Sequence, residues 1–144
     1  MLCVTPTARP IDWNTLVNAV GQVESGMLHR AIGDGGASRG AWQITRAAWQ
    51  DVSRLRKLSG ESIWPSWKTG AHREGVARDY ASSFLALLNS HLSSKLGRPP
   101  TVQELYAAYN LGLDGFRRRS YLLERCPEMT QNGAIKVAVL CQKP

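Results

Sequence analysis

Two carboxylates near the start of the chain, Glu24 and Asp34, have the side chains that acid–base chemistry requires. Asp12 is a good N-cap for a helix that continues to about residue 25, and Val17 and Val20 then precede Glu24 by two turns and by one. The carboxyl of Glu24 therefore projects from the apolar side of this helix, near its C-terminal end. Desolvation and the partial negative charge of the helix end both raise the pKa of such a group. Glycoside cleavage needs a carboxylic acid that stays protonated, although a Glu at such a place can also reach solvent or a salt bridge.

A glycine-rich segment follows, with the sequence Gly-Asp-Gly-Gly-Ala-Ser-Arg-Gly over residues 33–40. Four glycines in eight positions do not build a helix, so we expect a loop whose backbone can approach a substrate closely. Asp34 in this loop is a second carboxylate that can position water or stabilise positive charge at a sugar ring. It is equally a common turn-forming residue before glycine. A phosphate-binding loop is a weaker interpretation, because no Gly-Lys-Ser/Thr follows.

Three short motifs together resemble the lysozyme-like superfamily. They are Val23-Glu24-Ser25-Gly26, then Gly33-Asp34-x-Gly36-x-Ser38-x-Gly40-x-x-Gln43-Ile44, then Ala107-Ala108-Tyr109-Asn110-Leu111-Gly112. The resemblance is to the soluble lytic transglycosylase catalytic domain and to goose-type lysozymes. These families carry a catalytic Glu-Ser at a helix end, a G-x-x-Q element after a loop and an A-Y-N-x-G element on a later helix. The motifs cover residues 23–112, and the stretch 23–51 is also similar to invertebrate-type lysozymes.

The chain departs from the goose-type pattern at two places. Thr45 stands where those enzymes carry an Asp two residues after the Gln, and Ala41-Trp42 stands where a small residue and Met usually precede it. The choice between a hydrolase and a transglycosylase therefore stays open at this point.

The resemblance implies a role for each matching residue. Glu24 is expected to protonate the glycosidic oxygen, with Asp34 as the candidate assistant. The expected substrate-binding residues are Ser25, Ser38, Trp42, Gln43, Tyr109 and Asn110. The hydroxyl of Tyr109 is expected to hydrogen-bond the carboxyl of Glu24, and packing in the core one turn after Leu105 is its alternative role.

Several tryptophans are candidates for sugar binding, because indole rings suit the C–H faces of sugars. Trp42 is expected in the cleft. Trp64 and Trp67, on a segment with Pro65, are expected either to line the cleft or to form a hydrophobic plug. Trp49 fits the core of a helical domain.

The implied activity is cleavage of the β-1,4 bond between N-acetylmuramic acid and N-acetylglucosamine in peptidoglycan. If Asp34 activates or holds water, the outcome is hydrolysis. Otherwise the superfamily offers a route with one carboxylate, in which the substrate's acetamido group stabilises the oxocarbenium-like centre. Glu24 then acts as base on the muramic 6-hydroxyl and gives a 1,6-anhydro end. Neither route needs a metal or a cofactor.

Two other classes of function are compatible with parts of the sequence. A lysozyme-like module that binds glycan without cutting it is one, and the presence of Glu24 argues against it. A small basic helical protein that binds nucleic acid is the other. Such a protein gathers Lys and Arg on one recognition helix, whereas here they are spread along the chain.

The pattern of breaks and caps predicts a mainly helical domain of about six helices with the glycine-rich loop after the first. An irregular lead-in is expected over residues 1–10 and one lysozyme-like domain over 11–144. Loops are expected at 33–40 and 59–70. The expected helices cover 13–25, the stretch after Thr45, about 71–96, about 101–111, about 114–125 and 134–140. The last stretch alternates loosely like a strand, but no partner strand is visible.

Length and composition fit one globular domain. The chain has 144 residues, of which 43% are hydrophobic and 20% charged. A net charge of +7 favours a polyanionic partner, which can be nucleic acid, an anionic membrane or an anionic cell-wall polymer, and charge alone does not choose among them. No apolar run approaches the ~18 residues that span a bilayer. The N-terminal Met1-Leu2-Cys3-Val4 lacks the basic start of a signal peptide, yet the resemblance implies a monomeric, secreted or periplasmic protein that faces the wall.

The three cysteines do not form a closed disulfide framework. Cys126 and Cys141 are a candidate pair in an oxidising compartment. None of the cysteines has the C-x-x-C spacing of a zinc site.

Overall fold

The computed structural model describes residues 10–142, so Cys3 and all of the expected lead-in except Pro10 lie outside the described residues. The described elements, in chain order, are α1 (Trp13–Ser25), β1 (Ile32–Gly33), η1 (Asp34–Gly36), β2 (Ser38–Arg39), β3 (Ile44–Thr45), α2 (Arg46–Leu58), α3 (Trp67–Gly70), α4 (Glu74–Leu96), α5 (Val102–Arg118), η2 (Leu123–Arg125) and α6 (Glu128–Gln142). The prediction of a mainly helical fold with about six helices is confirmed. Within residues 10–142, none of the helices has the length and apolar character to cross a bilayer.

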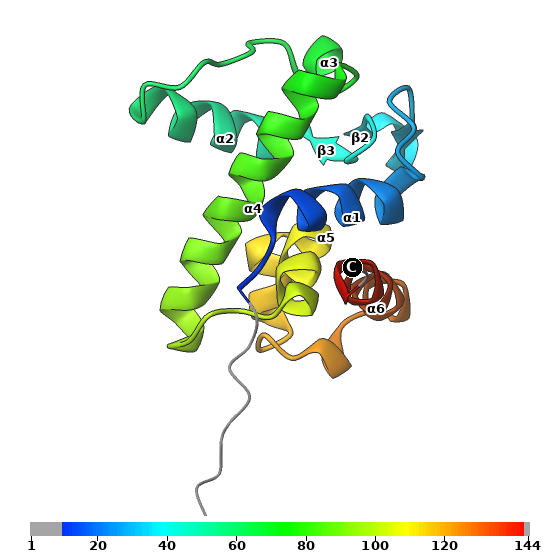
Figure 1. The fold of residues 1–144 in the computed structure, drawn as a ribbon, viewed down its shortest axis with the longest axis vertical. Helices are drawn as coiled ribbons and strands as arrows, with labels where there is room; N and C mark the ends of the chain where they lie inside the picture. The colour runs from blue at the N-terminus through cyan, green and yellow to red at the C-terminus, as the bar shows by residue number, and fades with distance from the viewer. Residues whose placement is uncertain (1–9, 143–144) are drawn as a thin grey trace, which may run out of the picture.

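Four helices enclose the core. α1 packs on α4 and α6, and α5 packs on the same two helices (Figure 1). Leu16, Leu88, Leu105 and Val137, one from each helix, are fully buried at their centre. The six consecutive residues 104–109 of α5 are all buried, which means that this half of α5 is surrounded by protein. The motif residues of α5 therefore begin inside the molecule and reach its surface only at Asn110.

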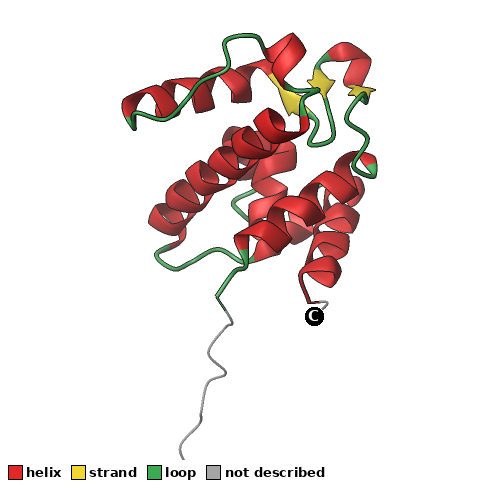
Figure 2. Ribbon diagram, turned by 45° about the horizontal axis from the view of Figure 1, so that its top comes forward, coloured by secondary structure: helices red, strands yellow, loops and turns green. Residues whose placement is uncertain are grey.

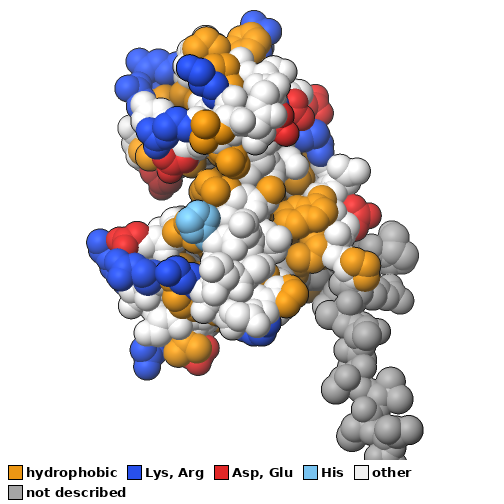
Figure 3. Space-filling view, turned by 90° about the vertical axis from the view of Figure 1, so that its left-hand side faces the viewer, with side chains coloured by type: hydrophobic (Ala, Val, Ile, Leu, Met, Phe, Trp, Pro, Cys, Tyr) orange, Lys and Arg blue, Asp and Glu red, His pale blue; other side chains and the backbone are white. Residues whose placement is uncertain are grey.

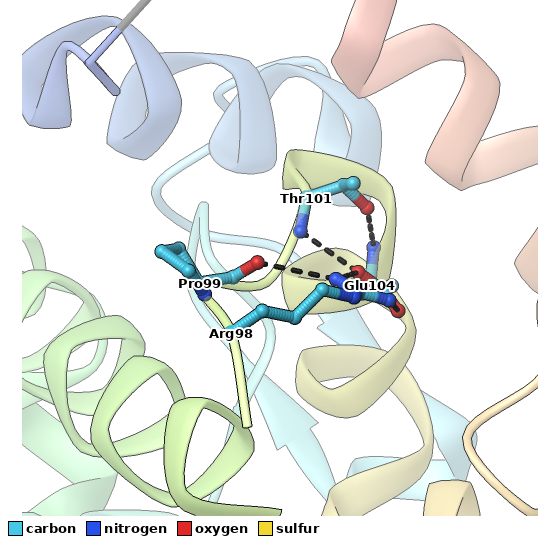
Figure 4. A network of polar contacts seen from close by, with 4 residues as sticks. All are labelled: Arg98, Pro99, Thr101 and Glu104. Carbon is cyan, nitrogen blue, oxygen red and sulfur yellow. Dashed lines mark hydrogen bonds and ion pairs between the residues drawn. The ribbon is translucent and has the colours of Figure 1, made fainter. Parts of the chain in front are cut away.

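A capping box and an ion pair fix the position at which α5 begins (Figure 4). The backbone N–H of Glu104 donates to Thr101 Oγ1 at 3.1 Å, and the N–H of Thr101 donates to Glu104 Oε1 at 2.9 Å. Arg98 donates to both carboxylate oxygens of Glu104, at 2.8 and 2.9 Å. Burial alone raises the pKa of Glu104, but the hydrogen bonds from Arg98 and Thr101 outweigh it and lower the pKa. The start of α5 is thereby tied to the end of α4.

The glycine-rich segment folds into a small antiparallel sheet beside the helices (Figure 2). β1 pairs with β2 and β2 pairs with β3, with Arg39 opposite both Ile32 and Ile44. Gly40, with a φ of 81°, makes the turn after β2. A Cβ at this position would overlap the carbonyl oxygen of Ala71, because the turn packs against the backbone that leads into α4. The loop expected at 33–40 therefore contains β2 and one residue of β1, and β3 follows it, so this small sheet was not predicted.

Several predicted helix boundaries differ from the structure. The expected loop at 59–70 contains the one-turn helix α3, and the long helix begins at Glu74 rather than at about residue 71. Gly112 interrupts α5 as expected, with a φ of 77° and a ψ of 162°, but the helix expected through residue 125 already ends at Arg118. Ser120 and Tyr121 both have a φ of 57°, and this left-handed backbone cannot continue a helix.

The disulfide considered between Cys126 and Cys141 does not form. Both cysteines are free thiols. They lie near opposite ends of α6, whose 15 residues span about 22 Å at the rise of an α-helix. A disulfide needs Cα atoms within roughly 7 Å, so no local adjustment joins them.

Candidate active site

Glu24 lies in the last turn of α1, just before the chain reverses at Gly26. Gly26 has a left-handed φ of 66° and its N–H donates to the carbonyl of Gln22 at 2.8 Å, which ends the helix. The side chain of Glu24 is partly buried at this end. The pKa of Glu24 is raised from 4.5 to about 7, chiefly because the side chain is buried and to a smaller extent because of the charge of Asp34. The carboxyl therefore keeps its proton up to neutral pH.

Two side chains of α5 act on this carboxyl. Hydrogen bonding from Tyr106 and Asn110 lowers the pKa of Glu24 and so offsets part of the effect of burial. Burial and the charge of Glu24 in turn raise the pKa of Tyr106 far above its ordinary value, which keeps its hydroxyl protonated and able to donate. Sequence reasoning missed Tyr106. It precedes Asn110 by one helical turn, and this spacing was the signal that could have found it.

The hydroxyl of Tyr109 does not reach Glu24, contrary to the expectation from the sequence. It donates to the backbone carbonyl of Trp42 at 2.6 Å, and the hydrogen bond is buried. The Tyr109 ring lies 5.2 Å from the ring of Phe84 in a tilted arrangement. Tyr109 therefore ties α5 to the segment before β3, while Tyr106 presents the hydroxyl to Glu24.

Asp34 approaches Glu24 from the glycine-rich segment. It is exposed and has a left-handed φ of 51° at the start of η1. Ser38 is only 4% exposed, and its hydroxyl donates to Asp34 Oδ2 at 2.8 Å. Ser38 is thus hidden beneath the loop and orients the Asp34 carboxylate, where direct contact with substrate had been expected.

Ser25 and Gln43 both hold the loop in place. The hydroxyl of Ser25 donates to the carbonyl of Ala41 at 2.7 Å and accepts from the N–H of Leu28 at 3.0 Å. Gln43 has a left-handed φ of 49°, and its side-chain amide donates to the carbonyl of Gly40 at 2.9 Å. Ser25 is engaged with backbone, whereas Gln43 also lines the groove described below.

The prediction that Trp42 binds sugar is wrong. Its ring is fully buried and its Nε1 donates to the carbonyl of Val17 at 2.8 Å, so no face is open to a ligand. Trp67 is also in the core and donates to the carbonyl of Ile44 at 2.8 Å. Trp49, as expected, is buried, and it stacks on Tyr80 with ring centroids 3.6 Å apart. Only Trp64 stays half-buried.

A groove of about 440 Å³ runs between α2 and α5, with α4 at its base. A space-filling view shows the molecule hollowed between an upper and a lower part, with hydrophobic side chains in the hollow (Figure 3). Ala48 and Asp51 line one side of the groove, Phe84 lies in it, and Tyr109 and Asn110 line the other. Glu24 does not line the groove, but Asn110 does and also acts on Glu24, so Asn110 connects the groove to the candidate acid. Its volume suits a small part of an extended polymer.

No relative supports or opposes this interpretation: no family model, no curated protein and no solved structure matches the chain. In the part of the chain that the structure describes, no three His, Cys, Asp or Glu side chains gather into a group that could hold a metal ion.

Proposed function

We propose that this protein is an enzyme that cleaves the glycan strands of bacterial peptidoglycan at the β-1,4 bond between N-acetylmuramic acid and N-acetylglucosamine. The observation that carries the proposal is the convergence of three separate segments on one partly buried carboxyl. The end of α1 supplies Glu24, the glycine-rich segment supplies Asp34, and α5 supplies Tyr106 and Asn110. These segments contain the three motifs that resemble the lysozyme-like superfamily.

In the first step, Glu24 donates its proton to the glycosidic oxygen. A pKa of about 7 suits this task, since the group holds the proton at neutral pH and can still release it. Tyr106 and Asn110 stabilise the carboxylate that donation leaves behind. As the bond to the leaving oxygen breaks, positive charge develops on the sugar ring, and a negative Asp34 nearby favours it.

In the second step, the ionised Glu24 acts as a base. If the acceptor is water, held with the help of Asp34, the product has a reducing end. If the acceptor is the muramic 6-hydroxyl, the product has a 1,6-anhydro end. The hydrogen bond from Ser38 holds the Asp34 carboxylate in one orientation, as an assisting role requires.

The groove between α2 and α5 is the proposed binding site for the strand. Asn110 connects it to Glu24, and its apolar surfaces suit the C–H faces of sugar rings. All the groups come from one chain, which is compatible with action as a monomer. A substrate in the cell wall implies that the protein works in the periplasm or after secretion, where its charge of +7 favours an anionic wall.

Digestion of purified peptidoglycan, followed by mass analysis of the soluble fragments, tests the proposal. The expected result is release of disaccharide-containing fragments. Reducing ends identify a hydrolase, and fragments lighter by one water identify the anhydro product. If the protein binds the polymer but leaves it intact, the protein is a binding module and not an enzyme. If the polymer is neither cut nor bound, both hypotheses fail.

A further inference from the structure

The surface of α6 that packs on α5 carries a buried hydroxyl with a specific partner. Thr130 is only 2% exposed, and its Oγ1 donates to Asn110 Oδ1 at 2.8 Å. α6 packs closely on α5 along this face (Figure 1). Asn110 in turn acts on Glu24. A chain of contacts therefore runs from α6 through Asn110 to the candidate acid.

The direction of this hydrogen bond determines which end of the Asn110 amide remains for Glu24. An amide carries an acceptor oxygen at one end and an NH₂ donor at the other. Because Oδ1 accepts from Thr130, the NH₂ group is the one left to face the carboxyl. An NH₂ donor favours the ionised carboxylate, whereas a carbonyl oxygen in the same place would favour the protonated acid.

The same face of α6 also makes room for Tyr106. Gly133 follows Thr130 by three residues and so lies on the same side of the helix. A Cβ at Gly133 would lie only 2.6 Å from the Tyr106 hydroxyl oxygen and 2.7 Å from Cζ. The ring of Tyr106 therefore packs directly against the backbone of Gly133. Any side chain at Gly133 would displace the Tyr106 hydroxyl from its present position.

We propose that Thr130 and Gly133 are positioning residues, through which α6 holds the Asn110 amide and the Tyr106 hydroxyl in the orientation that serves Glu24. The role of Glu24 as an acid rests on the proposed function, but the orientation of its neighbours does not. The titratable groups that face Glu24 are Asp34 from η1 and Tyr106 and Tyr109 from α5. Both tyrosines have raised pKa values and stay neutral, so only Asp34 adds a charge.

Replacement of Thr130 by Val tests the inference, because Val keeps the shape and removes the hydroxyl. Without that donor the amide is free to turn its oxygen toward Glu24, and we expect the pKa of Glu24 to rise by about one unit. The measurement is a titration of the Glu24 carboxyl carbon by NMR in protein labelled at glutamate side chains. Thr130→Ser keeps the hydroxyl and is expected to titrate like the wild type.

A glycine pair provides a second, independent test. Gly133→Ala displaces the Tyr106 hydroxyl and is expected to raise the pKa of Glu24 in the same direction. Gly75→Ala is the matched control, since Gly75 also lies in a helix but a Cβ there meets nothing within 4 Å. An amide spectrum of each variant verifies that it is folded.

The inference is overturned if Thr130→Val titrates like the wild type, or if Thr130→Ser shifts the titration as far as Val does. These outcomes are separate from the proposed function. If the wild-type protein releases no fragments from peptidoglycan, the proposed enzymatic function fails. The titration of Glu24 still reports the orientation of the Asn110 amide in that case. If fragments are released and all variants titrate alike, the proposed enzymatic function is supported, but the positioning role of α6 is not.

Discussion

Glu24 is subject to two opposing influences whose balance decides its chemistry. Burial disfavours its charge, while the side chains of Tyr106 and Asn110 favour it. Without the two polar neighbours, the carboxyl would hold its proton too tightly to act as a base in the second step of the proposed reaction. Without burial, it would be ionised at neutral pH and could not act as an acid in the first.

Replacing Glu24 by Gln is expected to change how stability depends on pH. The pKa of Glu24 is raised in the folded protein, so its contribution to stability is complete below the unfolded value near 4.5 and is lost as the pH rises through about 7. The Gln variant has no such loss. From urea unfolding at both ends of this range, the wild type should lose on the order of 2 kcal/mol relative to the variant. Parallel pH profiles would show that Glu24 is ionised normally.

Asp34→Asn is expected to lower the pKa of Glu24, because the charge that raises it is removed. Asn tolerates the left-handed φ of 51° and can still accept from Ser38, so the loop should keep its shape. The rate of fragment release should then begin to fall at a lower pH than in the wild type. If the pH–rate profile of Asp34→Asn is unchanged, or shifts to higher pH, the proposed electrostatic effect of Asp34 on Glu24 is contradicted.

The sequence pointed to Glu24 and Asp34 as candidate residues, but not to all of the side chains that lie around them. Helical spacing predicts on which face of a helix a residue lies, but it does not predict how deeply that face is buried in the folded protein. Trp42 was expected at a cleft and is fully buried. The choice between Tyr106 and Tyr109 as the partner of Glu24 depends on how α5 is rotated against α1, which local sequence does not encode.

The helices themselves were largely predictable because their ends carry strong local signals. Asp12 caps α1, Thr101 and Glu104 cap α5, and Gly97 ends α4 in a left-handed conformation. Two-residue strands and a helix of one turn are too short to produce a periodic pattern. The end of α5 was not predicted because Ser120 and Tyr121 adopt a positive φ, and neither residue type indicates such a conformation.

An alanine substitution is expected to destabilise the folded protein far more at Gly40 than at Gly35. Both have positive φ values, 81° and 64°, so an Ala costs about 1–2 kcal/mol at either one from backbone strain. At Gly40 the new Cβ also overlaps the carbonyl oxygen of Ala71, whereas at Gly35 it meets nothing within 4 Å. Urea unfolding should show Gly40→Ala to be at least about 3 kcal/mol less stable than the wild type. Equal losses at the two positions would mean that the turn does not pack on the segment before α4.

At the scale of the whole molecule, the site is a product of packing between distant segments. The groove lies between α2 and α5, and α4 and α6 fix the position of α5 (Figure 1). The order of motifs along the chain indicated one domain with a cleft. It could not indicate where the cleft runs, because the relative placement of α2 and α5 depends on long-range contacts such as that between Tyr109 and Trp42.

Binding to whole peptidoglycan is expected to weaken with salt. The net charge is +7, and positive side chains occur on both parts of the face shown in Figure 3. Raising the ionic strength from about 0.01 M to about 0.15 M shortens the screening length from roughly 30 Å to 8 Å, so the affinity for purified sacculi should fall about tenfold. A neutral chitin oligosaccharide is the control and should bind equally at both. Equal salt dependence for the two ligands would show that charge does not guide this protein to the wall.

If the carboxyl of Glu24 cuts the glycan strand, its replacement by Gln must slow cleavage, so the decisive experiment compares the wild type with Glu24→Gln. Both proteins are incubated with purified peptidoglycan at neutral pH, and released fragments and bound protein are quantified. We expect the variant to bind as the wild type does but to release fragments on the order of 100–10,000-fold more slowly. Release at the wild-type rate by a folded Glu24→Gln protein would contradict it.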